Sequence, residues 1–285
     1  MSDLTVRLSK LSPEKQGMLL QRIRQQAGYR GGWCEPEPAT ETRPFSPADQ
    51  NYVMRISEIG DLDNLIFEAC PRQPPKPGEV EIEIYASSLN FRDVMTALGL
   101  YPHASSRDRL LGDCAGKVVA VGDGVQDYRV GDEVLALVSH PYSAFTLVKS
   151  KYVAFKPADM SFAEAATIMT VYSTVYYSLY HLARLSRGES VLIHSAAGGV
   201  GLAAVQMAQW LGADIIASVG SEQKREYLRS LGVEQIVSSK NPDFDEEVLA
   251  LTGGKGVDVV LNSLAGDAII KGLALLKPLG RFIEL

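Results

Sequence analysis

The chain has 285 residues, of which 46% are apolar and 22% charged. This length allows two modest domains, each with its own core, and the composition is that of an ordinary globular protein. The formal net charge of −6 argues against non-specific binding of nucleic acid, which needs a basic face. No apolar run approaches the roughly 20 residues that cross a bilayer. We therefore expect neither nucleic acid nor a membrane among the partners.

The N-terminal region predicts a helix followed by a linker. Leu19, Ile23 and Ala27 recur at four-residue spacing, which is typical of one face of an amphipathic helix over residues 11–27. The next segment is rich in glycine, proline and charge, as linkers are. We assign residues 1–45 to this helix and linker, which either joins the chain to a longer polypeptide or forms a disordered extension.

Cysteine usage and the first residues point to a cellular compartment. The three cysteines, Cys34, Cys70 and Cys114, are isolated and form no CxxC pair. An odd and sparse set indicates a reducing compartment without a disulfide framework. The N-terminus, MSDLTVRLSK, lacks the apolar core of a signal peptide. These features predict a cytoplasmic protein.

Residues 46–160 have the pattern of a β-rich domain. Apolar and polar residues alternate over 80–87, and short apolar runs bounded by glycines follow at 116–122 and 133–138. The glycines and prolines are spaced like the turns of a compact barrel. We expect such a barrel here.

The pattern changes at residue 161. Residues 161–185 are apolar and helical in character, and Ser161 with Glu164 has the spacing of a capping box. Apolar strands then alternate with helices, which predicts a parallel, doubly wound sheet. Such nucleotide domains normally carry six strands, and we count five. We therefore expect the α/β domain over 161–285 to be incomplete and C-terminally truncated. Its helices should start near Gly199, Glu222, Asp243 and Gly266.

The segment SAAGGVG follows the first of these strands directly and opens a helix. Its glycines fit the spacing G-x-G-x-x-G, with alanine in the first place, and the strand before and helix after supply the required context. The glycines would let the loop approach a pyrophosphate, which the first amides of the helix would face. The alternative is a glycine-rich turn without a ligand. We predict a dinucleotide site at Ala196, Gly198, Gly199, Val200 and Gly201.

The second strand favours NADPH over NADH. An NAD site usually has a carboxylate about 20 residues after the glycine loop, to bind the ribose 2′-hydroxyl. Here Ser218 and Ser221 bracket that place, Lys224 follows, and Lys240 comes after the third strand. Hydroxyls and cations suit a 2′-phosphate, although Lys240 could equally be an ordinary solvated lysine. We therefore predict NADPH as the cofactor.

The sequence indicates chemistry without a metal. No His and Cys residues have the spacing of metal ligands, and the four histidines are isolated. His181 and His194 lie in apolar segments and are expected in the core. A zinc-driven alcohol dehydrogenase is therefore disfavoured. A carbon–carbon double bond conjugated to a carbonyl is already activated for hydride, provided that the protein orients it and stabilises the enolate.

The segment LNFRDVMTALGLYP (89–102) resembles the LNFRDV signature of enoyl reductase domains in modular polyketide synthases and animal-type fatty acid synthases. LLGDCAGKVVAVGDGV, SFAEAATI and VVLNSLAG fit the same family in order, so the resemblance covers about residues 50–285. It implies a GroES-like substrate domain over 46–160 and a Rossmann domain over 161–285, of the zinc-independent medium-chain reductase type. It also implies an NADPH-dependent reduction of a 2-enoyl thioester on an acyl carrier protein, beside neighbouring synthase domains.

The resemblance also implies roles for individual residues. Tyr101 occupies the place of a tyrosine that some of these domains use to protonate the α-carbon, and its alternative role is to anchor a loop. Asn90 is the candidate for orienting nicotinamide or the substrate carbonyl. Arg92 would lie beside the cofactor, although it could pair with Asp93 instead. The nicotinamide side would be lined by Thr174, Asn262, Ser263 and Leu264.

The sequence departs from the family after RFIEL, where a Gly-Lys pair and a later aspartate would supply alternative proton donors. The stretch VSHPYSAFTLVKS is also shorter than usual. Three other functions stay open. The chain could be a stand-alone NADPH quinone or enone reductase, or a module that binds NADPH without turnover. The third open function is a cyclopropane-forming reaction, in which the enolate displaces an internal leaving group.

Overall fold

The computed structural model describes residues 50–101 and 110–285, and the predicted helix and linker at the N-terminus lie outside them. The chain divides into two units, Met1–Ala166 and Thr167–Leu285. The short helix α4 (Phe162–Ala165) belongs to the first unit, where the Phe162 ring stacks on Tyr85 with centroids 4.7 Å apart. The division therefore falls after this helix, whereas the sequence pattern changes before it.

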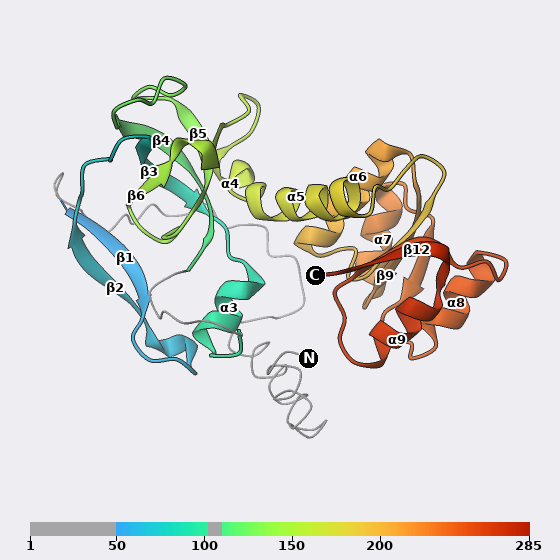
Figure 1. Cartoon of the computed structure of the whole chain (residues 1–285). Coiled ribbons are helices and arrows are strands. Elements are labelled where there is room, and N and C mark those ends of the chain that lie inside the picture. The colour runs from blue at the N-terminus through green and yellow to red at the C-terminus, as the bar shows by residue number, and fades with distance from the viewer. Residues whose placement is uncertain (1–49, 102–109) are drawn as a thin grey trace. The chain divides into compact units, whose positions relative to one another are not determined.

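The first unit is built on antiparallel strands (Figure 1). Five of them form a sheet in the order β6-β3-β4-β5-β7, and β1 and β2 form a separate ribbon. The strands are β1 (Gln50–Ile56), β2 (Leu65–Pro71), β3 (Glu79–Ser87), β4 (Gly112–Val121), β5 (Glu133–Val138), β6 (Phe145–Lys149) and β7 (Val153–Phe155). Two 3₁₀ turns accompany them, η1 (Leu62–Asn64) and η2 (Ser150–Tyr152).

This sheet is curled but not closed. Its end strands, β6 and β7, are separated in the chain only by the short turn η2, so the sheet must bend until its two edges approach. Within the described residues these two strands do not pair. The predicted barrel is therefore an open one. Its core contains the fully buried Val80 and Ile82, as the alternation predicts. Glu81, which lies between them, is buried as well and pairs with Arg72.

The second unit is a parallel sheet in the order β10-β9-β8-β11-β12. This order and the intervening helices are those of the nucleotide-binding doubly wound fold, so the predicted fold class is confirmed. The strands are β8 (Ser190–Ile193), β9 (Asp214–Val219), β10 (Gln235–Ser238), β11 (Val257–Asn262) and β12 (Leu276–Glu284). The helices, which start within one residue of the predicted positions, are α6 (Gly199–Leu211), α7 (Glu222–Ser230), α8 (Phe244–Leu251) and α9 (Asp267–Ala274).

The apolar segment from residue 161 is less regular than predicted. Ser161 and Glu164 do form the capping box of α4, but the chain then turns and continues as α5 (Met169–Val175) and a π-helix, η3 (Tyr176–Leu182). The wider turns of a π-helix break the 3.6-residue period on which the prediction of a buried face rested. His181 is accordingly exposed and stacks on Tyr177, so its assignment to the core is wrong.

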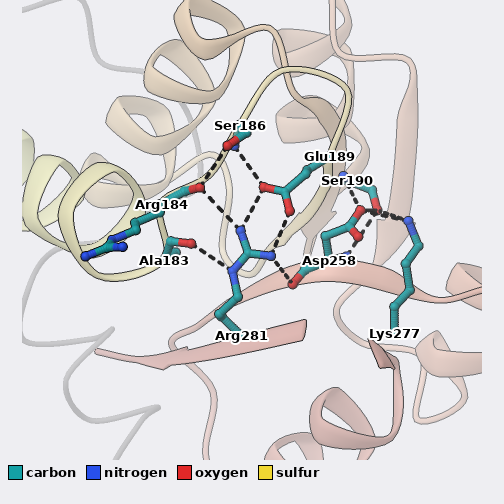
Figure 2. Close-up of polar contacts among 8 residues, drawn as sticks. All are labelled: Ala183, Arg184, Ser186, Glu189, Ser190, Asp258, Lys277 and Arg281. Carbon is teal, nitrogen blue, oxygen red and sulfur yellow. Dashed lines mark hydrogen bonds and ion pairs between the residues drawn. The ribbon is translucent and has the colours of Figure 1, made fainter. Parts of the chain in front are cut away.

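A polar cluster fastens β12 to the amino ends of β8 and β11 (Figure 2). The Arg281 guanidinium donates to both carboxylate oxygens of Glu189, at 2.8 and 2.7 Å, and to the Ala183 carbonyl at 2.8 Å. Beside it, Asp258 accepts from Lys277 at 2.7 Å and from the Ser190 hydroxyl at 2.8 Å. These contacts lie at the end of the sheet opposite the glycine loop. They hold the frame from which the loops at the carboxyl ends extend.

Candidate functional site

The glycine-rich loop leaves β8 at His194 and enters α6 at its N-cap, Gly198. Ser195 has a φ of 52°, and its carbonyl accepts from the Gly198 amide at 2.8 Å. A Cβ atom on Gly201 would lie 2.4 Å from the Ser195 carbonyl oxygen and 2.6 Å from Ala196 Cα. Only glycine therefore permits this close approach of the helix to the loop.

The start of α6 offers hydrogen-bond donors to an anion. The amides of Gly199, Val200 and Gly201 lie in the first turn, where no intrahelical acceptor exists and the helix dipole is positive. The Ala196 amide is different, since it donates to the Ser218 carbonyl at 3.0 Å. Ala196 therefore shapes the loop, and the three later residues supply the free donors. This arrangement fits the pyrophosphate of a dinucleotide.

Ser218 lies inside the second unit. Its side chain is fully buried near the end of β9, and its hydroxyl lies 3.0 Å from Nδ1 of His194. The predicted contact of Ser218 with the cofactor stays a prediction. His194 is buried as predicted, and burial lowers its pKa to about 4. The imidazole is therefore neutral at ordinary pH.

Exposed polar groups gather at the carboxyl ends of β9 and β10. Ser221 begins α7, where its hydroxyl accepts from the Lys224 amide at 3.4 Å. A Cβ atom on Gly220 would lie 3.3 Å from the Ser239 hydroxyl and 3.7 Å from Cε of Lys240. Lys240 therefore runs along Gly220, close to Ser221. Ser239 was not singled out in the sequence, because only the pairing of β9 with β10 brings it here.

The nearest carboxylate, that of Glu222, is already engaged. It accepts from Arg229 at 3.3 Å and lies 3.4 Å from Nε of Arg225. Arg225 also donates to the Ile236 carbonyl. Ser221, Lys224 and Lys240 are exposed at this edge, and Ser239 is half-buried beside them.

The loop after β11 is held from within. Asn262 is fully buried, and its amide nitrogen donates to the Leu264 carbonyl at 2.7 Å and to the Glu284 carboxylate at 2.8 Å. Its side-chain oxygen accepts from the Leu264 amide at 3.3 Å. Asn262 thus shapes the loop, with Glu284 as a partner that sequence reasoning missed. The Ser263 and Ser195 hydroxyls lie 3.2 Å apart, which joins this loop to the glycine loop.

Thr174 is half-buried near the end of α5, a helix that packs on the start of α6. A Cβ atom on Gly199 would be in ordinary contact with Val171, one turn before Thr174. The Tyr172 hydroxyl lies 2.5 Å from the Gln206 side-chain oxygen on α6. Thr174 is therefore on the helix that backs the glycine loop. Its predicted contact with nicotinamide stays a prediction.

The LNFRD motif builds the start of α3 (Phe91–Ala97) in the first unit. Asn90 is the N-cap residue, and its backbone amide donates to the Asp93 carboxylate at 3.1 Å. That carboxylate also accepts from the Tyr142 hydroxyl at 2.8 Å. Arg92 turns away and donates to the Leu111 carbonyl. Arg92 thus makes its hydrogen bond elsewhere, while its positive charge still opposes the rise in the pKa of the Asp93 carboxyl group.

The motif contains unusual buried polar groups. Asp93 is 3% exposed. Burial raises the pKa of its carboxyl group, although the Tyr142 hydroxyl and the Asn90 amide oppose that shift. Among the described residues, neither Oδ1 of Asp93 nor Nδ2 of Asn90 has a hydrogen-bond partner. Burial, and then the nearby Asp93 charge, raise the pKa of Tyr142 as well.

Tyr101 lies in the turn after α3, four residues beyond Ala97. Its amide donates to the Met95 carbonyl at 3.1 Å, and its side chain is 44% exposed. An exposed phenol can meet a substrate and exchange its proton with solvent, as a general acid must. The structure thus places Asn90, Arg92 and Tyr101 on one short helix and its flanks. Of the other predicted cofactor residues, Thr174 lies on α5, and the rest lie on or after strands of the parallel sheet.

Two family models match the chain. The alcohol dehydrogenase GroES-like domain matches residues 76–147, and the zinc-binding dehydrogenase model matches residues 199–285. Residues 50–101 and 110–285 contain no group of three or more His, Cys, Asp or Glu side chains that could hold a metal ion. This part of the chain therefore does not fit the zinc of the second model's name. In the same residues, no helix is long and apolar enough to span a membrane.

Similar proteins narrow the family. The chain is 42% identical over 246 residues to highly-reducing polyketide synthase 1 of Aureobasidium melanogenum. The matched segment covers 85% of this chain but 11% of that protein. The crystal structure of CurK enoyl reductase is 47% identical, with a TM-score of 0.79 over 83% of this chain and 74% of that one. The CurF ER cyclopropanase from the curacin A biosynthetic pathway is 39% identical, with a TM-score of 0.76 over 82% and 74%.

The domain matches and the solved relatives agree with the geometry of the two units. They imply an oxidoreductase module with a nicotinamide cofactor, which the glycine cradle at Gly198 and Gly201 fits. The chain spans only a small part of the synthase that it matches. It belongs to the enoyl reductase domains of polyketide synthases, within the medium-chain dehydrogenase/reductase superfamily.

Proposed function

We propose that this domain uses NADPH to reduce the 2,3 double bond of an enoyl thioester carried on an acyl carrier protein. The observation that carries the proposal is the LNFRD helix, with Asn90 and Tyr101 at its two ends, in a chain that also has the glycine loop. Similarity to CurK enoyl reductase and to a polyketide synthase supports this substrate class.

NADPH is proposed because of the groups beside Gly220. Lys240 and Ser239 lie close to this residue, Ser221 follows it, and the next residue, Glu222, pairs with two arginines. A 2′-phosphate would accept hydrogen bonds from the lysine and the two hydroxyls. The same groups give a ribose 2′-hydroxyl no carboxylate to bind.

The bound cofactor would supply a hydride to the β-carbon of the enoyl chain, and a proton must then reach the α-carbon. In this proposal the Tyr101 phenol donates that proton to the enolate. Nδ2 of Asn90 has no hydrogen-bond partner among the described residues, and in this proposal it donates to a carbonyl oxygen, of the thioester or of the carboxamide. Solvent reprotonates Tyr101, which its exposure allows.

The direct test incubates a crotonyl-type thioester on an acyl carrier protein with the chain and NADPH, and reads the carrier by mass spectrometry. The proposed reaction adds one hydride and one proton, so deuterium from 4-deuterated NADPH should appear at the β-carbon. Tyr101→Phe should slow the reaction or change the configuration at the α-carbon. No conversion by the wild-type domain within its synthase would contradict the proposed function.

Cofactor choice has its own test. Lys240→Ala should weaken NADPH binding about tenfold, since one charge-assisted hydrogen bond is lost, and should leave NADH binding unchanged. Lys255→Ala is the matched control, because Lys255 is also an exposed lysine of the same unit. Equal affinities of the Lys240 and Lys255 variants for NADPH would remove Lys240 from the site.

Cyclopropane formation is the second candidate function, because the CurF cyclopropanase is similar over most of the chain. It is tested with a different substrate. With a γ-chloro enoyl thioester, hydride again adds to the β-carbon. The α-carbon of the enolate then attacks the γ-carbon and expels chloride, so that no proton is taken up. Loss of chlorine with ring closure would favour this function, and retention of chlorine in a saturated product would favour simple reduction.

A further inference from the structure

The stretch between β5 and β6 is joined to the LNFRD motif by one side chain. Tyr142 lies in this stretch, and its hydroxyl is 2.8 Å from Oδ2 of Asp93 and 3.0 Å from the Ser88 carbonyl oxygen. The Tyr142 carbonyl accepts from the Met54 amide of β1 at 2.9 Å. Tyr142 is thus fixed to the ribbon on one side and to the motif on the other.

The Asp93 carboxylate accepts two hydrogen bonds at the start of α3. Its Oδ2 atom accepts from both the Tyr142 hydroxyl and the backbone amide of Asn90. The neighbouring Ser88 hydroxyl donates to Asp113, a second buried acid, at 3.0 Å. The Asn90 backbone and the first turn of α3 are therefore held by a carboxylate that lies inside the domain.

Tyr101 lies four residues after Ala97, the last residue of α3. The Leu100 and Tyr101 amides both donate to the Met95 carbonyl, at 2.8 and 3.1 Å. The chain between Asn90 and Tyr101 is thus one short helix followed by a closed turn. A displacement of Asp93 would therefore act on both residues.

We propose that Asp93 and Tyr142 are positioning residues of the reductase, which fix Asn90 and Tyr101 relative to the rest of the substrate domain. The inference deepens the proposed function, on which its catalytic readout rests, although the geometric part stands without it. Neither residue touches the reacting atoms in this scheme.

The composition of the cluster favours positioning over mere stability. A buried carboxylate with one oxygen unpartnered among the described residues is costly, and apolar side chains of similar size would commonly stabilise a fold more. A helix start can also be capped by an exposed serine or aspartate. A directional contact from a distant segment, by contrast, fixes the angle of the helix, and small displacements of catalytic groups reduce rates strongly.

The experiment compares two tyrosines that each lose a single hydroxyl. Tyr142→Phe removes the contact with Asp93. Tyr128→Phe is the control, since its hydroxyl donates to the Val153 carbonyl at 2.6 Å, in the same unit but away from α3. Asp93→Asn keeps an oxygen for Tyr142 and Asn90, and Asp93→Ala does not. The measurements are kcat, KM for NADPH, the unfolding midpoint and hydrogen exchange of the Asn90 and Tyr101 amides.

Tyr142→Phe should lower kcat roughly ten- to a hundredfold, with KM for NADPH within twofold of wild type and an unfolding midpoint like that of Tyr128→Phe. Asp93→Asn should recover most of the kcat that Asp93→Ala loses, and exchange at Asn90 and Tyr101 should quicken only in the Tyr142 and Asp93 variants. Equal kcat for the two tyrosine variants, or unchanged exchange at both amides, overturns the proposal. If wild type does not reduce the thioester, the proposed function fails, and the exchange comparison alone decides whether the pair positions the helix.

Discussion

Removing the Arg281 guanidinium should destabilise the second unit far more than removing an ordinary surface arginine. Arg281→Met keeps most of the aliphatic stem but loses both hydrogen bonds to Glu189 and the one to the Ala183 carbonyl (Figure 2). Among the described residues, the Glu189 carboxylate then keeps its hydrogen bond from the Ser186 amide. The strand β12 and the end of η3 would no longer be joined through this side chain.

The magnitude follows from the number of contacts and their exposure. Hydrogen bonds to charged groups contribute about 1.5–3 kcal/mol each. Three such bonds at a fully buried site would therefore exceed about 4 kcal/mol. Because the Arg281 and Glu189 side chains are 29% and 28% exposed, solvent screening reduces this sum. We expect a loss of about 2–3 kcal/mol in the free energy of unfolding.

The assay is urea unfolding followed by far-ultraviolet circular dichroism, with Arg229→Met as control. Arg229 pairs with Glu222 at 3.3 Å, but these side chains are 55% and 66% exposed, so its loss should change little. The Arg281 hydrogen bond holds the pKa of Glu189 below its usual value of 4.5. The stabilisation is therefore complete above about pH 4.5 and is lost as the pH falls through the lowered pKa. Equal unfolding free energies of the two variants at neutral pH would refute the reasoning.

Three further predictions concern the nucleotide unit. Gly201→Ala should weaken NADPH binding at least about tenfold in a fluorescence titration, because the new methyl group overlaps the Ser195 carbonyl; wild-type affinity would show that the loop adapts. His194 should stay neutral in an NMR titration down to about pH 4, and its low pKa should make the fold less stable as pH drops from about 6.5 to 4; a titration midpoint near 6.5 would contradict its burial. Glu284→Ala should weaken NADPH binding several-fold and Glu284→Gln less, since glutamine keeps an oxygen for Asn262; equal effects would exclude that hydrogen bond as the cause.

Local residue patterns predicted much of the site, but not the direction of each side chain. Gly198 and Gly201 could be identified because their spacing, between a strand and a helix, has one structural meaning. Ser218 and Ser221 were equivalent in the sequence, yet one lies in the core on His194 and the other caps an exposed helix. That difference depends on where β9 ends, which propensity leaves uncertain by a few residues.

Hydrogen-bond partners that lie far apart in the chain could not be predicted from the sequence. The sequence predicts that Asn262 lines the nicotinamide side, which stays a prediction, but it did not reveal that the side-chain amide binds Glu284 on the neighbouring strand. Asp93 was weighed only against its neighbour Arg92, whereas its partner is Tyr142, 49 residues away. A side chain chooses among partners by three-dimensional proximity, and a single sequence carries no record of it.

The sequence by itself determined the order of the β-rich and nucleotide-binding units, the five parallel strands and the starts of their helices. Hydrophobic period, glycine spacing and capping residues are local properties, and they specify local structure. Only the tertiary structure decided that the β-sheet is curled but open, that η3 exposes His181, and which polar groups face the candidate site. Those features follow from packing between segments far apart in the chain, where burial and hydrogen-bond partners are set together.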